Sequence, residues 1–225
     1  MIQCMIFDLD DTLYPEREFV LPRLRAVAAR LIERFGRPLD FEAALVASYE
    51  SGRPGRLFDR VLEKAGLAPE AALVRELVGL YRGGPVHATL YPDVRPALER
   101  WGRLMPLALV TDGFADTQRR KVEALGLAPL FAAIVFTADL GPGLAKPHPA
   151  AFRQVRERIG FDGPALYVGD NPPLDVPPCR AMGWPAVRIV RPGTRFGGVA
   201  ADDSCRPDLT IATLDELEGL VLALK

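Results

Sequence analysis

The chain has 225 residues, 49% of them hydrophobic and 25% charged, which is enough for one large domain or for a core with a smaller insert. Its net charge of −1 lacks the basic excess of a nucleic-acid binder, so we expect no nucleic-acid partner. We expect no membrane span, because no run of about 18 apolar residues occurs. Without a leader pattern, the expected location is cytoplasmic. The three cysteines share no metal-like spacing and are predicted to be reduced.

Short apolar runs predict five strands, at residues 2–7, 107–110, 133–136, 165–168 and 186–190. Continuous apolar character over four to six residues suits strands that are covered on both faces, as in parallel sheets. Apolar residues at helical spacing predict helices over roughly 94–104, 115–125, 149–159 and 214–224. This alternation predicts an α/β fold with a three-layer core.

Residues 14–91 interrupt the alternation, because they contain helical patterns and no comparable strand. The patterns cover residues 20–35, 41–49, 57–65 and 71–81, and Gly- and Pro-containing breaks separate them. We therefore predict an all-helical insert at 14–91 within an α/β core formed by residues 1–13 and 92–225.

Acidic and basic motifs stand at or shortly after the predicted strand ends, where an open α/β sheet places its ligand site. In chain order they are Asp8-Leu9-Asp10-Asp11-Thr12, Thr111-Asp112-Gly113, Lys146, and Gly169-Asp170-Asn171 with Asp175 behind it. Like charges about 4 Å apart cost roughly 4 kcal/mol per pair at an effective dielectric near 20. Asp8, Asp10, Asp170 and Asp175 would thus resist assembly even with Lys146, and they predict a divalent cation.

Lys146 also stands out by composition. The chain has 24 Arg and only 4 Lys, so a lysine in this place indicates a specific role. A compact ammonium suits a position between a carboxylate and a phosphoryl group better than a broad guanidinium does.

The joint order of these motifs resembles the haloacid dehalogenase-like (HAD) hydrolase superfamily, in particular its phosphatase branch with phosphoglycolate phosphatases and pyrimidine 5'-nucleotidases. The resemblance implies a Rossmann-like core with a parallel sheet and a helical cap of the subfamily I type. It also implies an Mg²⁺-dependent phosphatase that hydrolyses a small phosphorylated metabolite through an aspartyl-phosphate.

The resemblance assigns roles to the acidic residues. Asp8 would be the nucleophile, and Asp10 the general acid and then the base, a task that requires a pKa raised toward neutrality. Dehalogenases of the superfamily lack an acid two places after the nucleophile, so Asp10 favours a phosphatase. The metal ligands would be Asp8, the Asp10 carbonyl and Asp170, with Asp175 either a direct ligand or a supporting group. We interpret Asp11 as a surface loop acid.

The remaining motifs would bind the substrate. The Thr111 hydroxyl and the backbone N–H groups of Asp112 and Gly113 would hold phosphoryl oxygens. Many relatives have Asn in place of Asp112, which here is expected to add a carboxylate facing the entrance. Arg53 and Arg56 in the cap are candidates for contacting an anionic substrate.

Pro177-Pro178 departs from the family pattern, and the helix after Asp170 is expected to begin late or to be distorted. A phosphomutase of the same superfamily and a phospho-accepting receiver-like signalling module are the alternative functions. The sequence allows either a monomer or a homodimer.

Overall fold

The computed structural model describes residues 1–36, 40–52, 55–198 and 202–219. The chain divides into two compact units, one of Met1–Glu16 with Ala88–Lys225 and the other of Arg17–His87. Within the described ranges, no helix is both long and apolar enough to cross a membrane.

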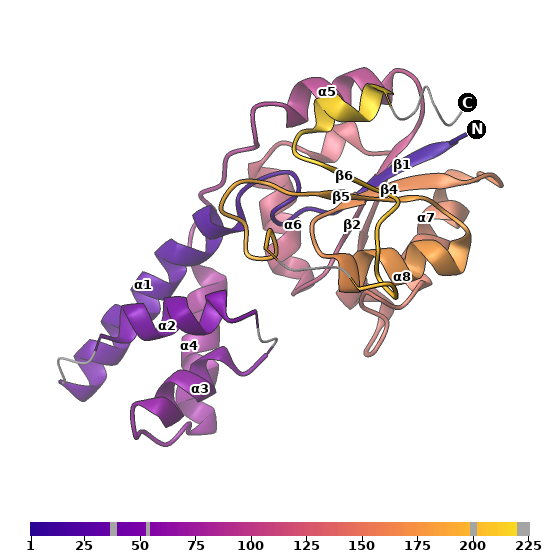
Figure 1. The fold of residues 1–225 in the computed structure, drawn as a ribbon. Helices are drawn as coiled ribbons and strands as arrows, with labels where there is room; N and C mark the ends of the chain where they lie inside the picture. Colours follow the sequence, from indigo (N-terminus) through magenta and orange to yellow (C-terminus); the bar gives the residue numbers. More distant parts are fainter. Residues whose placement is uncertain (37–39, 53–54, 199–201, 220–225) are drawn as a thin grey trace. The chain divides into compact units, whose positions relative to one another are not determined.

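A six-stranded parallel sheet forms the centre of the first unit, in the order β3-β2-β1-β4-β5-β6 (Figure 1). The strands are β1 (Cys4–Phe7), β2 (Leu107–Thr111), β3 (Ala133–Phe136), β4 (Ala165–Gly169), β5 (Ala186–Ile189) and β6 (Leu209–Ile211). In the register, Met5 of β1 pairs with Leu107 on one side and with Leu166 on the other. The predicted α/β class is therefore confirmed, and β6 is an additional strand.

Helices cover both faces of this sheet. They are α5 (Val94–Gly102), α6 (Ala115–Ala124), α7 (Ala150–Ile159) and α8 (Pro172–Met182), with short 3₁₀ segments η1 (Ala128–Leu130), η2 (Thr137–Leu140) and η3 (Leu214–Glu216). Helices α7 and α8 lie together on one side of the sheet and α5 on the other (Figure 1). Alternate strand residues such as Ile6 and Tyr167 pack with Phe152 of α7 in one buried cluster. The helix predicted at 214–224 begins as η3, and its residues 220–224 lie outside the described residues.

The expectation that the helix after Asp170 begins late is wrong. Helix α8 begins at Pro172, directly after Asn171, and runs without interruption through Pro177 and Pro178. Proline suits the first turn of a helix because its φ angle is already helical and its missing N–H would have no partner there. Inside a helix, proline removes a backbone hydrogen bond. Here Val176 and Pro178 are buried, and the burial of these apolar side chains offsets that loss.

Contacts within the first unit join the place where the chain leaves this unit to the place where it re-enters it. The backbone N–H of Tyr91 donates to the Leu13 carbonyl at 3.0 Å. Arg191 is buried and donates to both carboxylate oxygens of Asp93 at 2.9 Å and to the Thr12 carbonyl at 3.3 Å. Residues 13 and 91 are thus fixed side by side by contacts that belong to the first unit alone.

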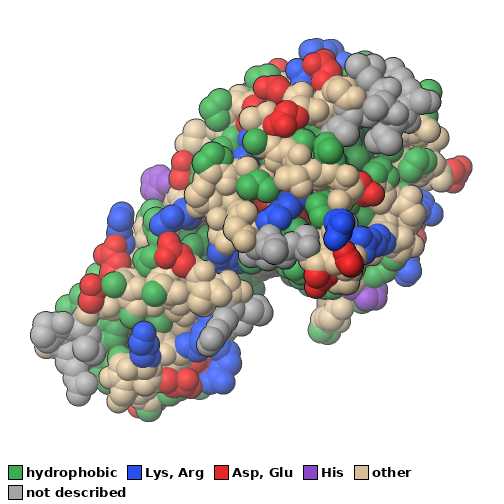
Figure 2. Space-filling model, viewed as in Figure 1, with side chains coloured by type: hydrophobic (Ala, Val, Ile, Leu, Met, Phe, Trp, Pro, Cys, Tyr) green, Lys and Arg blue, Asp and Glu red, His purple; other side chains and the backbone are tan. Residues whose placement is uncertain are grey.

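The second unit is helical and has its own apolar core. Its helices are α1 (Glu16–Phe35, whose first residue belongs to the first unit), α2 (Phe41–Glu50), α3 (Leu57–Lys64) and α4 (Ala71–Gly83). Their buried residues include Leu24, Leu45 and Leu62. Arg23 is buried, and it donates to the carbonyls of Gly84 and Pro85 at 2.9 and 2.6 Å, which ties the end of this unit to its first helix. On the face shown in Figure 2, basic and acidic side chains are interspersed rather than separated by sign.

Candidate active site

Three neighbouring strands deliver the acidic motifs to one edge of the sheet. Asp8 directly follows β1, Thr111 ends β2, and Asp170 directly follows β4. Because β2, β1 and β4 are adjacent and parallel, their carboxyl ends meet where the strand order reverses, the usual ligand position of such sheets. The Asp8 backbone N–H donates to the Val168 carbonyl at 2.9 Å, which extends the pairing of β1 and β4 into the site.

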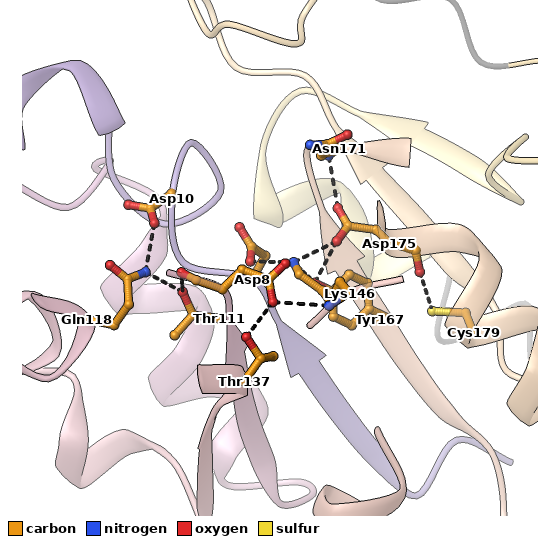
Figure 3. A network of polar contacts seen from close by, with 11 residues as sticks. Asp8, Asp10, Thr111, Gln118, Thr137, Lys146, Tyr167, Asn171, Asp175 and Cys179 are labelled. Atoms are coloured by element: carbon orange, nitrogen blue, oxygen red, sulfur yellow. Dashed lines mark hydrogen bonds and ion pairs between the residues drawn. The ribbon is translucent and has the colours of Figure 1, made fainter. Parts of the chain in front are cut away.

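Lys146 is at the centre of a buried polar cluster (Figure 3). Its ammonium donates to Asp8 Oδ1 at 2.7 Å, to Asp175 Oδ1 at 2.8 Å and to the Tyr167 hydroxyl at 2.9 Å. The three charged side chains are only 4 to 8% exposed. Burial alone would lower the pKa of Lys146, but the charges of Asp175 and Asp8 outweigh it and raise that pKa well above its usual value. Lys146 therefore carries a permanent positive charge between two carboxylates.

Asp175 has protein donors on both carboxylate oxygens. Oδ1 accepts from Lys146 and from the Tyr167 hydroxyl, at 2.9 Å for the latter, and Oδ2 accepts from the Asn171 N–H at 2.9 Å. Gly169 makes room for this carboxylate, since a Cβ at that position would lie 2.8 Å from Asp175 Cγ. Asp175 thus has the contacts of a supporting group that orients Lys146.

Asp170 and Asp8 offer the carboxylates for a cation. Burial, and then the charges of Asp8 and Asp175, raise the pKa of Asp170 well above its usual value. The pKa of Asp8 is raised to about 7, mainly by burial and despite Lys146. Among the residues that the structure describes, none forms a hydrogen bond or ion pair with the Asp170 carboxylate. Such a carboxylate, buried beside other acids, fits a cation.

The donor set limits which cation would fit. In the described ranges, no group of three or more His, Cys, Asp or Glu side chains is arranged to hold a metal ion by itself. Asp8, Asp170 and the Asp10 carbonyl would leave several positions to water or substrate. Mg²⁺ is commonly bound in this way, through one or two carboxylates and substrate phosphate oxygens.

The Asp10 carboxylate lies in a second group of polar contacts beside this cluster (Figure 3). Its Oδ1 accepts from the Tyr14 hydroxyl and, at 2.7 Å, from Lys121 Nζ, while Oδ2 accepts from Gln118 Nε2 at 2.8 Å. Burial raises the pKa of Asp10, but the charge of Lys121 and these hydrogen bonds outweigh it and leave the pKa lowered. This differs from the raised pKa that the sequence led us to expect for a general acid.

The Thr111-Asp112-Gly113 motif is arranged differently from what we expected. The Asp112 carboxylate makes contacts that we did not expect: its Oδ1 accepts from the Thr137 hydroxyl at 2.6 Å and from the Lys146 N–H at 3.2 Å. It therefore fixes the backbone that carries Lys146. Gly113 has a φ of +114°, a conformation that favours glycine.

Asp11 is not the surface acid we expected. It is 3% exposed, and its carboxylate accepts from the backbone N–H groups of Glu16 at 2.9 Å and Arg195 at 3.3 Å. Its φ of +55° turns the chain sharply after Asp10, so this carboxylate stabilises the loop that carries the site.

Arg53 and Arg56 are the two cap arginines predicted to contact the substrate. Arg53 lies outside the described residues. Arg56 belongs to the second unit, where its exposed guanidinium pairs with Asp59 at 3.4 Å and with Glu63 at 3.2 Å. Its neighbours are acids of its own helix.

Tyr167, Gln118 and Lys121 belong to the site, although sequence reasoning gave them no catalytic part. The composition argument that singled out Lys146 applies equally to Lys121, another of only 4 lysines. Gln118 and Lys121 are three residues apart and so share a face of α6. Tyr167 gave no comparable signal, because it stands inside an apolar strand run.

Fold and site together define a parallel α/β protein with buried carboxylates and a buried lysine at the carboxyl edge of its sheet. Residues 2–183 match the model of the haloacid dehalogenase-like hydrolases. The chain is 32% identical to a glyceraldehyde 3-phosphate phosphatase of Methanopyrus kandleri, over 98% of this chain and 97% of that protein. It is also 37% identical to a phosphoserine phosphatase of Thermus thermophilus, over 72% of this chain and 62% of that protein.

A solved structure shares the whole fold. The magnesium-bound HAD hydrolase YfnB of Bacillus subtilis superposes with a TM-score of 0.72 at 22% identity, over 98% of both chains. The chain belongs to the haloacid dehalogenase-like hydrolase family, and its curated relatives above are phosphatases.

Proposed function

We propose that this hydrolase is an Mg²⁺-dependent phosphatase that cleaves a small phosphomonoester through an aspartyl-phosphate on Asp8. The observation that carries the proposal is the contact of the buried Lys146 ammonium with Asp8, beside Asp170, whose carboxylate has no hydrogen-bond or ion-pair partner among the described residues. A permanent positive charge beside the nucleophile suits the transfer of an anionic group.

In the first half-reaction, Asp8 attacks phosphorus with the oxygen that Lys146 does not hold. The new bond joins Asp8 to phosphorus as the ester P–O bond breaks, and Asp10 protonates the departing alkoxide. Because its contacts lower the pKa of Asp10, this carboxylate must take up a proton from solvent before the step. Asp175 and the Tyr167 hydroxyl both contact the Lys146 ammonium, which keeps this positive charge in place beside Asp8.

In the second half-reaction, Asp10 takes a proton from a water molecule, and that water attacks the phosphorus of the aspartyl-phosphate. The acyl phosphate bond breaks, which restores the Asp8 carboxylate and releases inorganic phosphate. A bound Mg²⁺ would neutralise charge on the phosphoryl oxygens and lower the repulsion between phosphate and the acidic cluster. Asp8, Asp170 and the Asp10 carbonyl would hold it.

We propose a substrate of triose-phosphate size, because the glyceraldehyde 3-phosphate phosphatase is similar over nearly its whole length. Phosphoserine is the next candidate, from the relative that matches over 72% of this chain.

We further propose that the helical insert at residues 14–91 acts as the cap that selects among substrates. Arg53 and Arg56 remain candidate contacts, although the acidic partners of Arg56 make it the weaker one.

A panel of phosphate esters tests the proposal by the inorganic phosphate released. It should contain glyceraldehyde 3-phosphate, phosphoserine, phosphoglycolate, a nucleoside monophosphate and p-nitrophenyl phosphate, each with Mg²⁺ and with EDTA. We expect turnover with Mg²⁺ and none in EDTA. Isomerised sugar phosphate without released phosphate would favour a mutase, and a stable phosphoprotein without turnover would favour the receiver-like alternative.

A further inference from the structure

We infer that Lys121, Gln118 and Tyr14 are positioning residues. They hold the Asp10 carboxyl group where it can protonate the leaving group. The inference rests on the proposed function, in which Asp10 is the general acid and then the base. None of the three is expected to touch the reacting atoms.

The three donors reach Asp10 from two separate segments of the first unit. Lys121 and Gln118 lie on one face of α6, more than 100 residues along the chain, and Tyr14 follows Asp10 by four residues. Tyr14 and Lys121 share Oδ1, and Gln118 donates to Oδ2, so both oxygens are held. A carboxylate bound from both sides cannot rotate freely about its side-chain torsions.

The burial of Lys121 argues against a role in surface charge alone. Its side chain is 4% exposed and its ammonium lies 2.7 Å from Asp10 Oδ1. Desolvating an ammonium is costly unless it is paired, whereas an apolar side chain would fill the same space without that cost. The buried ammonium is thus paired with the Asp10 carboxylate and fixes its Oδ1.

Gln118 connects Asp10 to the expected phosphoryl-binding hydroxyl. Its Nε2 donates both to Asp10 Oδ2 at 2.8 Å and to Thr111 Oγ1 at 2.5 Å. An amide nitrogen has two N–H donors, so one group serves both contacts. Thr111 Oγ1 accepts from Gln118, and its own hydroxyl donates to the Asp112 carbonyl at 3.5 Å. Gln118 thereby fixes the distance between the proton donor and the group that would hold the phosphoryl.

The test compares two esters that differ in their need for an acid. p-Nitrophenolate leaves without a proton, whereas the alkoxide of glycerol 3-phosphate requires one. We expect Lys121→Met and Gln118→Leu to lower kcat/KM for glycerol 3-phosphate at least about tenfold more than for p-nitrophenyl phosphate, as part of the 10²–10⁴-fold that such catalysis supplies. The parameter kcat/KM reports the first half-reaction only, so the later base role of Asp10 does not confuse the comparison.

Reference variants distinguish a failure of the positioning role from a failure of the proposed function. Asp10→Asn should show the same preference for the activated ester, and adding Lys121→Met to it should lower activity little further. Equal losses for both esters in Asp10→Asn would overturn the acid role in the proposed function. If Asp10→Asn discriminates while the Lys121 and Gln118 variants lower both esters equally, the positioning role is wrong and the proposed function stands.

Two further variants keep the test decisive. Lys64→Met makes the same chemical change at an exposed lysine of α3 and should alter neither ester. Tyr14→Phe removes a single oxygen atom from a fully buried side chain and should fold even if Lys121→Met does not. A loss in Tyr14→Phe that is equal for both esters would also contradict the positioning role.

Discussion

Replacing Lys146 with Met should destabilise the metal-free protein more than any other single change at the site. The substitution keeps an unbranched side chain of similar length and removes only the ammonium. It deletes the contacts with Asp8 at 2.7 Å, with Asp175 at 2.8 Å and with the Tyr167 hydroxyl at 2.9 Å. Two buried carboxylates then lose their counter-charge.

The magnitude follows from those distances. At an effective dielectric near 20, each ion pair contributes about 6 kcal/mol of attraction. Desolvation offsets several kcal/mol per ion, but removing one partner leaves the other charges buried, for which losses of about 3–5 kcal/mol are typical. We expect the free energy of unfolding to fall by that amount at pH 8.

The loss should depend on pH because Asp8 can become neutral. Its pKa in the folded protein is raised to about 7, so folding favours the protonated form and the metal-free protein loses stability as pH rises from about 4 to 7. Without Lys146 the pKa of Asp8 should rise further. At pH 6 Asp8 is then mostly protonated in both proteins, and the difference in stability should be smaller than at pH 8.

Urea unfolding in EDTA at pH 6 and pH 8 measures both effects, with Lys64→Met as the control. The control should change stability by less than about 0.5 kcal/mol, as is usual for exposed positions. A loss below about 1 kcal/mol for Lys146→Met at pH 8, or a larger loss at pH 6 than at pH 8, would refute the reasoning.

Three further outcomes are expected. Asp8→Asn should reduce turnover of the best ester to below a few per cent, since the amide removes the nucleophile; released phosphate measures it, and near-normal turnover would exclude the covalent route. Mg²⁺ at about 100 times its Kd should stabilise the wild type by about 2.7 kcal/mol in thermal unfolding; an equal gain in Asp170→Asn would remove Asp170 from the metal site. Gly169→Ala should cost about 1–3 kcal/mol, because its Cβ would lie 2.8 Å from Asp175 Cγ and from Tyr167 Cε1. Gly79→Ala is the matched control for it, since within the described structure an added Cβ there meets nothing within 4 Å.

The sequence predicted those parts of the fold in which local pattern and burial agree. The runs that end at Asp8 and Gly169 are apolar throughout and buried on both faces, so their composition alone reveals them. Strand β6 (Leu209–Ile211) was missed because three residues with a central, exposed Thr carry no such pattern. Its place in the sheet comes from pairing with β5.

The side-chain contacts of the site could be predicted only where chemistry restricts the choice. A Lys among many Arg pointed to Lys146, but nothing local shows that Asp112 meets Thr137 and the Lys146 N–H, 25 and 34 residues away. Asp11 was misread because its burial depends on a left-handed turn and on distant backbone donors. These contacts arise from tertiary structure, which residue spacing does not encode.

The contacts that join residues 13 and 91 make the helical insert replaceable. The Tyr91–Leu13 hydrogen bond and the Arg191 contacts to Thr12 and Asp93 belong to the first unit, so they do not depend on what the intervening chain contains. An insert anchored at two adjacent points adds no strain to the sheet when its length or sequence changes. If the insert is the cap that we propose, changes within residues 17–87 would alter substrate preference while the loop that carries Asp8 and Asp10 keeps its geometry.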